Sequence, residues 1–367
     1  MTGGPTQGPD PDRGSSSAGT ATSSPALGSG RLNSLSVGSF ELESGATLSD
    51  LTIAYRHDGP GPGEAPQVLA VHALTGSADA AGDWWAPLIG PGRALDTNQV
   101  GVLCANLLGG RYGTTGPTSP DPATGSLYGR AFPEVSTRDQ ARAQWRLLDA
   151  LAISELALAT GGSLGGMVAL EVALERPGAV RTVVPMAAPA ATGALAIAWN
   201  AIQLQVIERL GEDGLAIARQ LAMTTYRSET DFDSRFGRRQ EADGRESVVS
   251  YLDYQGRKLV ERFDPATYRI LVRAMDRHDI GRDRGGVVRA LTALAGHGTR
   301  LTGLGISGDI LYGPGQVRAL VRDAAAAGLG ATYRELESAK GHDAFLVEWD
   351  QLGAILTEAL EGIAQTA

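Results

Sequence analysis

Cysteine is almost absent from this chain of 367 residues, which contains a single one, Cys104. One cysteine excludes an internal disulfide and any metal site built from several thiolates. Lysine is nearly as rare, with two residues, and the formal charge of −9 is opposite in sign to that of a protein that binds a nucleic-acid backbone. We therefore expect no metal site and no nucleic-acid partner.

Long apolar runs and targeting signals are missing as well. The best transmembrane candidate, residues 186–202, is rich in alanine and is interrupted by Pro189, Gly193 and Asn200. It falls short of the roughly twenty apolar residues that a membrane-spanning helix needs. No N-terminal stretch joins a basic segment to an apolar one, as a signal peptide does. We expect a soluble, cytoplasmic protein with no membrane partner.

The first part of the chain consists mainly of Gly, Ser, Thr, Pro and Asp. Such a segment cannot bury enough apolar surface to offset the entropy lost on ordering, and we predict a disordered tail over residues 1–34. Apolar and polar residues then alternate over residues 35–40 and 51–55, which predicts two half-buried antiparallel strands.

Short, continuous apolar runs replace this alternation further along the chain and are separated by helical spacing, for example over residues 138–151. Buried strands that alternate with helices predict an α/β fold, a mostly parallel sheet with helices on both faces. Between residues 191 and 288 the strands stop while helical spacing continues. We therefore predict a core domain of residues 35–190 and 289–367, interrupted by a helical lid insertion of residues 191–288. The runs lie at residues 68–71, 100–104, 156–159, 180–184, 300–307 and 332–336.

The segment Gly161-Gly162-Ser163-Leu164-Gly165 fits the pattern G-x-S-x-G. In a glycine-rich chain this pattern is weak alone, and a glycine-rich turn without chemistry would also produce it. Here a predicted strand leads in and a predicted helix leads out, which is the setting of a nucleophile elbow. The N-terminus of that helix also offers free N–H groups to an oxyanion. Ser163 is therefore our candidate nucleophile.

A serine hydroxyl needs a base, and the chain has five histidines. His342 lies just beyond the last predicted strand and is the candidate base. We interpret His57, His278 and His297 as solvated surface residues, and His72 as a structural or oxyanion-loop residue. Asp309 follows a predicted strand between the nucleophile and the base, whereas the alternative acid, Asp323, lies on a helix face. The order serine, aspartate, histidine is that of α/β hydrolases.

Taken together, these motifs resemble the homoserine O-acetyltransferase family of acyltransferases with the α/β-hydrolase fold. The resemblance extends from about Val37 to Leu360. It rests on several blocks in the same order, namely His72-Ala73-Leu74-Thr75-Gly76, Trp84-Trp85, Asn106-Leu107-Leu108-Gly109-Gly110, Gly161-Gly162-Ser163-Leu164-Gly165-Gly166-Met167, Ser250-Tyr251-Leu252-Asp253-Tyr254-Gln255-Gly256, Arg262-Phe263-Asp264 and Gly341-His342-Asp343.

The resemblance implies roles for individual residues. Ser163 would be the nucleophile, His342 the base and Asp309 its partner, with the backbone N–H groups of Leu74 and Leu164 forming the oxyanion hole. Without the resemblance, Arg219 reads as a solvated helix charge and Asp343 as a loop aspartate. By the resemblance, Arg219 would bind the carboxylate of the amino-acid substrate and Asp343 its amino group. Tyr226 would support the same site.

The same resemblance implies the reaction, in which acetyl-CoA and L-homoserine give O-acetyl-L-homoserine and CoA through an acyl-serine intermediate. The product would serve methionine biosynthesis. Acetyl-CoA would be a co-substrate, with no bound cofactor, and the protein would be a cytoplasmic homodimer. The alternatives are a serine O-acetyl- or O-succinyltransferase, a homoserine O-succinyltransferase and an esterase with the same triad. Residues that bind CoA cannot be assigned from the sequence.

One departure from the family pattern concerns the acyl donor. Arg111 stands where a cysteine is common, beside the loop that approaches the acyl site. Its guanidinium in the acyl pocket would favour a donor with a terminal carboxylate. The other interpretation is a surface arginine in a polar loop.

Overall fold

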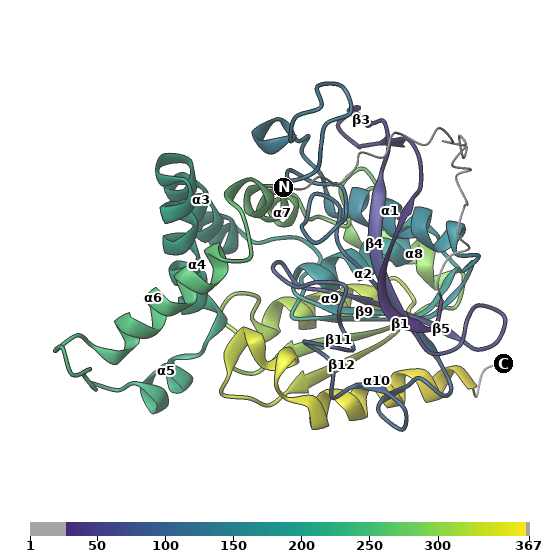
Figure 1. Ribbon diagram of the computed structural model, residues 1–367. Coiled ribbons are helices and arrows are strands. Elements are labelled where there is room, and N and C mark those ends of the chain that lie inside the picture. The colour runs from purple at the N-terminus through teal and green to yellow at the C-terminus, as the bar shows by residue number, and fades with distance from the viewer. Residues whose placement is uncertain (1–26, 365–367) are drawn as a thin grey trace, which may run out of the picture.

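The computed structural model of the protein describes residues 27–364 and has a central sheet of eight strands (Figure 1). The strand order is β1-β4-β8-β5-β9-β10-β11-β12. β4 pairs antiparallel with β1 and β8, and the strands from β8 to β12 are parallel. The predicted α/β fold is thus confirmed. The strands are β1 (Ser29–Ser36), β4 (Thr52–Asp58), β5 (Gln67–Val71), β8 (Gly101–Ala105), β9 (Leu156–Gly162), β10 (Val180–Met186), β11 (Arg300–Ile306) and β12 (Gly330–Leu336).

Helices cover both faces of this sheet (Figure 1). In β5, Leu69 and Val71 pack into one apolar core, whereas Val68 and Ala70 pack into the other. Because both faces are buried, these strands appear in the sequence as continuous apolar runs. One face carries α1 (Thr137–Ala150), α2 (Leu164–Glu175), α8 (Val287–Ala295) and α9 (Pro314–Ala326), and the other carries α10 (Trp349–Ala364).

Several short elements complete the core. The strand pairs are β2 (Phe40–Glu41) with β3 (Thr47–Leu48) and β6 (Ile89–Gly90) with β7 (Leu95–Asp96). Two 3-10 helices are η1 (Gly129–Ala131) and η2 (Gly341–Leu346). Within residues 27–364, no helix combines the length and apolar character that crossing a membrane requires.

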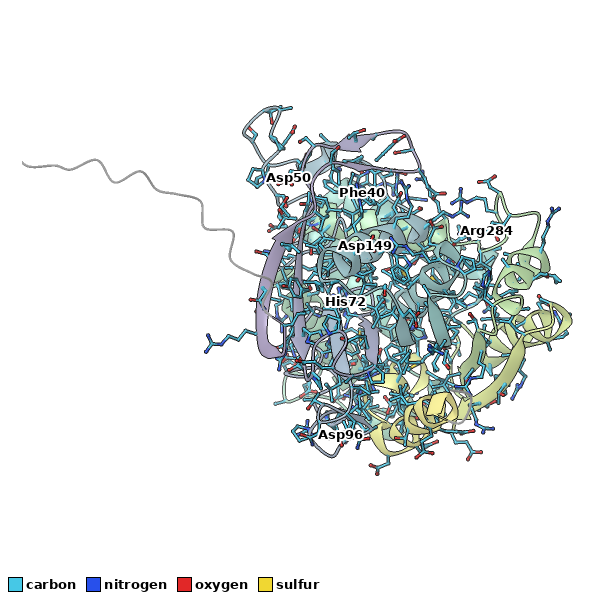
Figure 2. The ribbon with its side chains drawn as sticks, turned by 90° about the vertical axis from the view of Figure 1, so that its right-hand side faces the viewer. Phe40, Asp50, His72, Asp96, Asp149 and Arg284 are labelled. Atoms are coloured by element: carbon cyan, nitrogen blue, oxygen red, sulfur yellow. The ribbon has the colours of Figure 1, made fainter. Side chains whose placement is uncertain are left out.

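Part of the predicted disordered tail forms a strand. Residues 1–26 lie outside the described part, but residues 29–34, placed in the predicted tail of residues 1–34, belong to β1. This strand lies at the edge of the sheet (Figure 2) and pairs with β4 through its backbone. Side chains such as Leu32, which is 56% exposed, contribute little burial. Pairing through the backbone at a sheet edge does not require apolar side chains, so the composition of residues 29–34 did not indicate a strand.

The predicted lid is a group of helices that extends away from the sheet on the left of Figure 1. Gly256 lets α6 approach α4 closely, because a Cβ atom there would lie 2.8 Å from the carbonyl oxygen of Ala216. The lid therefore packs as a unit. Its helices are α3 (Ala194–Leu210), α4 (Glu212–Tyr226), α5 (Glu229–Arg235), α6 (Ser247–Val260) and α7 (Pro265–Asp276).

The lid ends sooner than the predicted boundary at residue 288. An antiparallel bridge between Ala191 and Asp279 closes its base. The chain after it belongs to the core, because Arg284 forms an ion pair of 2.7 Å with Glu171 of α2 and α8 packs on α2 and α9. Helical spacing is the same in a lid helix and a core helix, so the sequence could not separate them.

A close backbone contact joins the end of β5 to the turn between β9 and α2. A Cβ atom on Gly161 would lie 2.4 Å from the carbonyl oxygen of Val71, and one on Gly165 only 2.1 Å from it. Both distances are far below normal contact. The two glycines of the G-x-S-x-G pattern therefore allow the strand and the helix to pass against β5.

This contact predicts a large effect of one added methyl group. Gly165→Ala should lower the free energy of unfolding by about 1–3 kcal/mol or more, because backbone atoms must move to accept it. Gly315→Ala is the matched control, since nothing lies within 4 Å of a Cβ atom there. Thermal unfolding should show a lower midpoint for the first variant alone, and a wild-type midpoint for Gly165→Ala would contradict the close contact.

Candidate active site

Ser163 occupies the sharp turn between β9 and α2. Its φ of 58° and ψ of −125° are rare for a residue other than glycine. Its N–H donates to the carbonyl of Met186 at 2.9 Å, and its own carbonyl accepts from Met167. The side chain is nearly buried, with 5% of the residue exposed. The turn thus presents the hydroxyl beyond the carboxyl end of the sheet, as a nucleophile elbow does.

His342 and Asp309 form a buried pair close to this turn. Nδ1 of His342 lies 2.7 Å from Oδ2 of Asp309. The other carboxylate oxygen of Asp309 accepts from the backbone N–H groups of Leu311 and Tyr312, at 2.8 and 3.0 Å. A carboxylate only accepts, so Nδ1 carries the proton and Nε2 keeps its lone pair. The imidazole is oriented as a base would be.

Ser163 and His342 line the same cavity of about 750 Å³, which we call the Ser163 cavity. Within residues 27–364, Nε2 of His342 is buried without a hydrogen-bond partner. The structure therefore assembles the aspartate–histidine pair and places the serine in the same cavity, but it does not show the serine–histidine hydrogen bond. That contact commonly tightens only when the substrate binds.

The pKa values of the two buried histidines near this cavity are shifted in opposite directions. Burial lowers the pKa of His342, but the charge and hydrogen bond of Asp309, together with the charge of Asp343, outweigh it and raise that pKa above the usual 6.5. Burial lowers the pKa of His72 to about 4. His72 is therefore neutral near pH 7.

Two backbone N–H groups belong to residues close to the candidate nucleophile, because Leu74 lines the Ser163 cavity and Leu164 follows Ser163 directly. Leu74 lies in a tight turn closed by a hydrogen bond of 2.9 Å from Gly76 N to Ala73 O, and Leu164 is the first residue of α2. In the described part of the chain neither N–H has an acceptor. His72 supports the turn, because its Nδ1 donates to Ala73 O at 2.8 Å while Nε2 accepts from Leu107. The arrangement fits an oxyanion hole.

Arg219 and Tyr226 come from lid helix α4 and line the Ser163 cavity. The guanidinium carbon of Arg219 lies 5.3 Å from the centre of the Tyr226 ring, and this ring lies 5.8 Å from that of His342. Among the described residues, no carboxylate lies within 4 Å of the Arg219 guanidinium. Its charge is therefore available to an anionic ligand beside the imidazole.

Asp343 also lines the cavity, but it has a partner that the sequence did not reveal. Nη2 of Arg227 lies 3.3 Å from Oδ2 of Asp343. Arg227 follows α4 directly, and its pairing with Asp343 could not be predicted from the sequence. Asp343 is thus a fixed carboxylate in the cavity wall.

The lid residues 226–231 hold the loop that carries His342. Ser228 donates to the carbonyl of Ala339, and Lys340 pairs with Asp231 at 3.0 Å. Gly341 fits against this lid segment, because a Cβ atom there would lie 2.7 Å from the N atom of Ser228. These contacts position the histidine loop from the lid side, and none of them could be read from sequence spacing.

Three predictions for residues outside the cavity need correction. His57 and His278 are buried, not solvated. His57 bonds to Gly28 and Gln67, and His278 bonds to Thr137 and Pro189. His297 is exposed, as predicted.

The donor-binding interpretation of Arg111 is wrong: its guanidinium pairs with Asp264 at 3.3 Å, and the residue does not line the Ser163 cavity. Polar neighbours in sequence do not reveal whether a side chain is covered by a distant segment.

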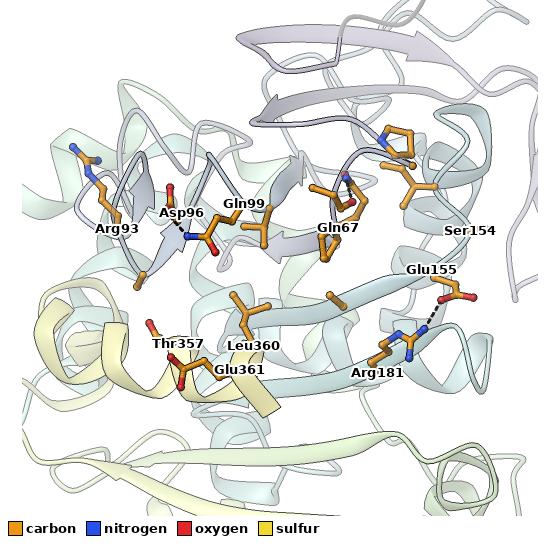
Figure 3. A pocket seen from close by; sticks show the side chains of 18 of the residues that line it. Gln67, Arg93, Asp96, Gln99, Ser154, Glu155, Arg181, Thr357, Leu360 and Glu361 are labelled. Atoms are coloured by element: carbon orange, nitrogen blue, oxygen red, sulfur yellow. Dashed lines mark hydrogen bonds and ion pairs between the residues drawn. The ribbon is translucent and has the colours of Figure 1, made fainter. Parts of the chain in front are cut away.

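A larger cavity of about 840 Å³ lies at the opposite edge of the sheet (Figure 3). Its lining includes Gln67 at the start of β5 and Arg181 near the start of β10, and Arg181 pairs with Glu155 at 3.2 Å. Open α/β sheets bind their ligands beyond the carboxyl ends of the strands. Because the larger cavity lies at the amino ends and contains none of the triad residues, the Ser163 cavity is the candidate site.

Metal-binding residues do not cluster in the described part of the chain: residues 27–364 contain no group of three or more His, Cys, Asp or Glu side chains that could hold an ion. Cys104 is buried, and burial raises the pKa of its thiol well above the usual value. It lies outside the lining of the Ser163 cavity.

Comparison with known proteins identifies first the fold class and then the family. The sequence profile of the family described as alpha/beta hydrolase fold matches residues 66–262, more than half of the chain. The protein is therefore an α/β-hydrolase-fold protein with the elbow and the histidine–aspartate pair of that class.

Among curated relatives, a homoserine O-acetyltransferase of Moorella thermoacetica is 41% identical over 350 residues, 87% of this chain and 93% of the relative. One of Thermus thermophilus is 45% identical over 317 residues, 79% of this chain and 80% of the relative. The chain belongs to the homoserine O-acetyltransferase family.

Solved structures agree with this placement. The structure of a homoserine O-acetyltransferase from Staphylococcus aureus has a TM-score of 0.77 and 31% identity, covering 90% of this chain and 95% of the other. A mutant of esterase E22 has a TM-score of 0.83 at 22% identity, covering 90% and 99%. The second likeness shows the shared fold alone, so the fold does not separate transferase from esterase.

The histidine environments predict two distinct titrations. In an NMR titration of the imidazole nitrogens, His342 should gain its proton with a midpoint above 6.5, because Asp309 stabilises the cation. His72 should stay neutral until about pH 4. Asp309→Asn should lower the His342 midpoint and leave that of His72 unchanged. A His342 midpoint below 6.5 in the wild type would mean that burial outweighs Asp309.

Proposed function

We propose that the protein transfers the acetyl group of acetyl-CoA to the hydroxyl of L-homoserine through an acetyl-Ser163 intermediate. Membership of the family supports this reaction. The observation that carries it is the meeting, in one cavity, of Ser163 and the His342–Asp309 pair with the unneutralised guanidinium of Arg219. The product is suited to methionine biosynthesis, as the names of the relatives imply.

In the first step, Nε2 of His342 takes the proton of Ser163 while the hydroxyl oxygen attacks the thioester carbonyl carbon. The N–H groups of Leu74 and Leu164 stabilise the resulting oxyanion. The carbon–sulfur bond breaks, the proton passes from His342 to the sulfur, and CoA leaves. Asp309 keeps the imidazole in the required tautomer and stabilises its cation throughout.

In the second step the homoserine hydroxyl gives its proton to His342 and attacks the acetyl-serine carbonyl. The ester bond to Ser163 breaks, and the serine oxygen recovers the proton. The same base and the same oxyanion hole serve both steps. This chemistry requires only the triad and acetyl-CoA as a co-substrate, with no bound metal or prosthetic group.

The acceptor is bound as a zwitterion. Arg219 takes its carboxylate, Asp343 takes its ammonium group, and Tyr226 fixes the direction of Arg219 by packing between that residue and His342. A cation and an anion held in one partly dry cavity suit an α-amino acid better than a neutral ester. The lid keeps water from the acetyl-serine, so that transfer outpaces hydrolysis.

We further propose a cytoplasmic homodimer joined through the lid. Lid helix α3 exposes large apolar side chains, including Leu195, Ile202 and Leu210, which are 61%, 51% and 53% exposed. Exposed apolar patches of this kind commonly mark contact surfaces between proteins.

Removal of the nucleophile tests the covalent mechanism. Ser163→Ala should reduce CoA release from acetyl-CoA by on the order of 10³-fold or more, because no acyl-enzyme can form. Intact-protein mass spectrometry after a rapid quench should show one added acetyl group in the wild type and none in the variant. Retention of a tenth of the wild-type activity by Ser163→Ala would exclude the acyl-serine intermediate.

Removal of Arg219 tests the acceptor. Arg219→Ala leaves the homoserine carboxylate unpaired, at a cost of about 2–5 kcal/mol, so kcat/KM for homoserine should fall roughly thirty-fold or more. Hydrolysis of p-nitrophenyl acetate, which has no carboxylate, should change much less. Arg209→Ala, an exposed lid arginine outside the cavity, is the control. Equal losses in both reactions of Arg219→Ala would assign Arg219 to lid stability instead of acceptor binding.

A further inference from the structure

The lid side of the Ser163 cavity carries two further positive charges. Lys258 lies in the last turn of α6, and Arg262 follows four residues later, just after the end of the helix. Both line the cavity. Among the described residues, neither side chain has a carboxylate within 4 Å. Lys258 lies near the ring of Tyr254, and Arg262 donates to the carbonyl of Thr75 at 2.7 Å.

Two other charged side chains of this cavity are neutralised by ion pairs. Arg56 is neutralised by Asp58 at 2.8 Å and by Asp79, and Asp343 is paired with Arg227. Asp83, an exposed residue outside the lid, is the remaining carboxylate of the lining and has no ion pair within the described residues. The surplus positive charge of the cavity therefore comes from the lid residues Arg219, Lys258 and Arg262.

These two cations lie at different depths. Lys258 is exposed, Arg262 is half-buried, and Ser163 is nearly buried. When the thioester of an acyl donor reaches Ser163, the rest of the donor must extend toward the exposed end of the same cavity. In a CoA thioester that part carries the phosphates, which the pantetheine arm separates from the acyl group. A polyanion approaching a chain of net charge −9 needs a local positive surface.

We propose that Lys258, at the exposed end of the cavity, binds the phosphates of the CoA donor. This inference rests on the proposed acetyl-CoA-dependent function and assigns the donor-binding residues that the sequence left open. Lys258 makes the direct phosphate contact at the exposed end. Arg262 extends the positive surface inward and holds Thr75 beside the oxyanion turn, so the donor's charged part and its reacting carbonyl meet the same lid segment.

A comparison of two donors tests the proposal. Lys258→Ala should raise KM for acetyl-CoA about five- to tenfold, the low end of what a charge-assisted hydrogen bond contributes, because Lys258 is exposed. The same variant should acetylate Ser163 normally from S-acetyl-N-acetylcysteamine, a thioester without phosphates. Lys258→Glu should weaken the use of acetyl-CoA further and again spare the small thioester. We choose Lys258 because Arg262 also supports the oxyanion turn.

Arg257→Ala is the matched control. It removes one positive charge from the same helix turn, but Arg257 does not line the cavity. Calorimetric titration with CoA itself, which cannot react, should show weaker binding to Lys258→Ala and wild-type binding to Arg257→Ala. The KM of the wild type for acetyl-CoA should also rise with ionic strength more steeply than that of Lys258→Ala.

The outcomes separate this inference from the proposed function. Equal effects of Lys258→Ala on both donors, equal effects of Lys258→Ala and Arg257→Ala, or no effect of either would overturn the phosphate site while leaving the acetyltransferase reaction intact. A wild-type protein that neither binds CoA nor accepts an acetyl group from acetyl-CoA on Ser163 would overturn both.

Discussion

The contact of the β5 carboxyl end with the β9–α2 turn fixes most of the active-site geometry. The carbonyl of Val71 leaves no space for a side chain on Gly161 or Gly165. The oxyanion turn follows Val71 directly, and Ser163 lies between the two glycines. One backbone contact therefore sets the N–H groups of Leu74 and Leu164 relative to each other and to the nucleophile.

The core and the lid both contribute side chains to the Ser163 cavity. The core supplies Ser163, Asp309 and His342, which follow the carboxyl ends of β9, β11 and β12. The lid supplies Arg219 and Tyr226, which face the reacting groups from the other side. Because lid residues 226–231 also hold the loop of His342, a displacement of the lid would move His342 as well as Arg219 and Tyr226. The same lid segment therefore positions both the cavity side chains of the lid and the loop that carries His342.

Much of the fold was predictable because buried parallel strands have an unmistakable apolar pattern, as Val68 to Val71 does. The elbow at Ser163 and the pairing of His342 with Asp309 were predictable because both features have defined places along an α/β-hydrolase chain. β1 was missed because its backbone, not its side chains, holds it to the sheet. The burial of His57 and the pairing of Arg227 with Asp343 depend on contacts between distant segments, which spacing in one sequence does not encode.

The bridge between Ala191 and Asp279 has a consequence for how such proteins diversify. The chain leaves the core and returns to it through two paired residues, so the anchoring points of the insertion stay adjacent whatever lies between them. Changes in the length or sequence of the intervening helices therefore need not alter the register of β10 or β11. The substrate preference of this fold can therefore change through substitutions or insertions in the lid, while the residues that the core contributes to the site stay in place.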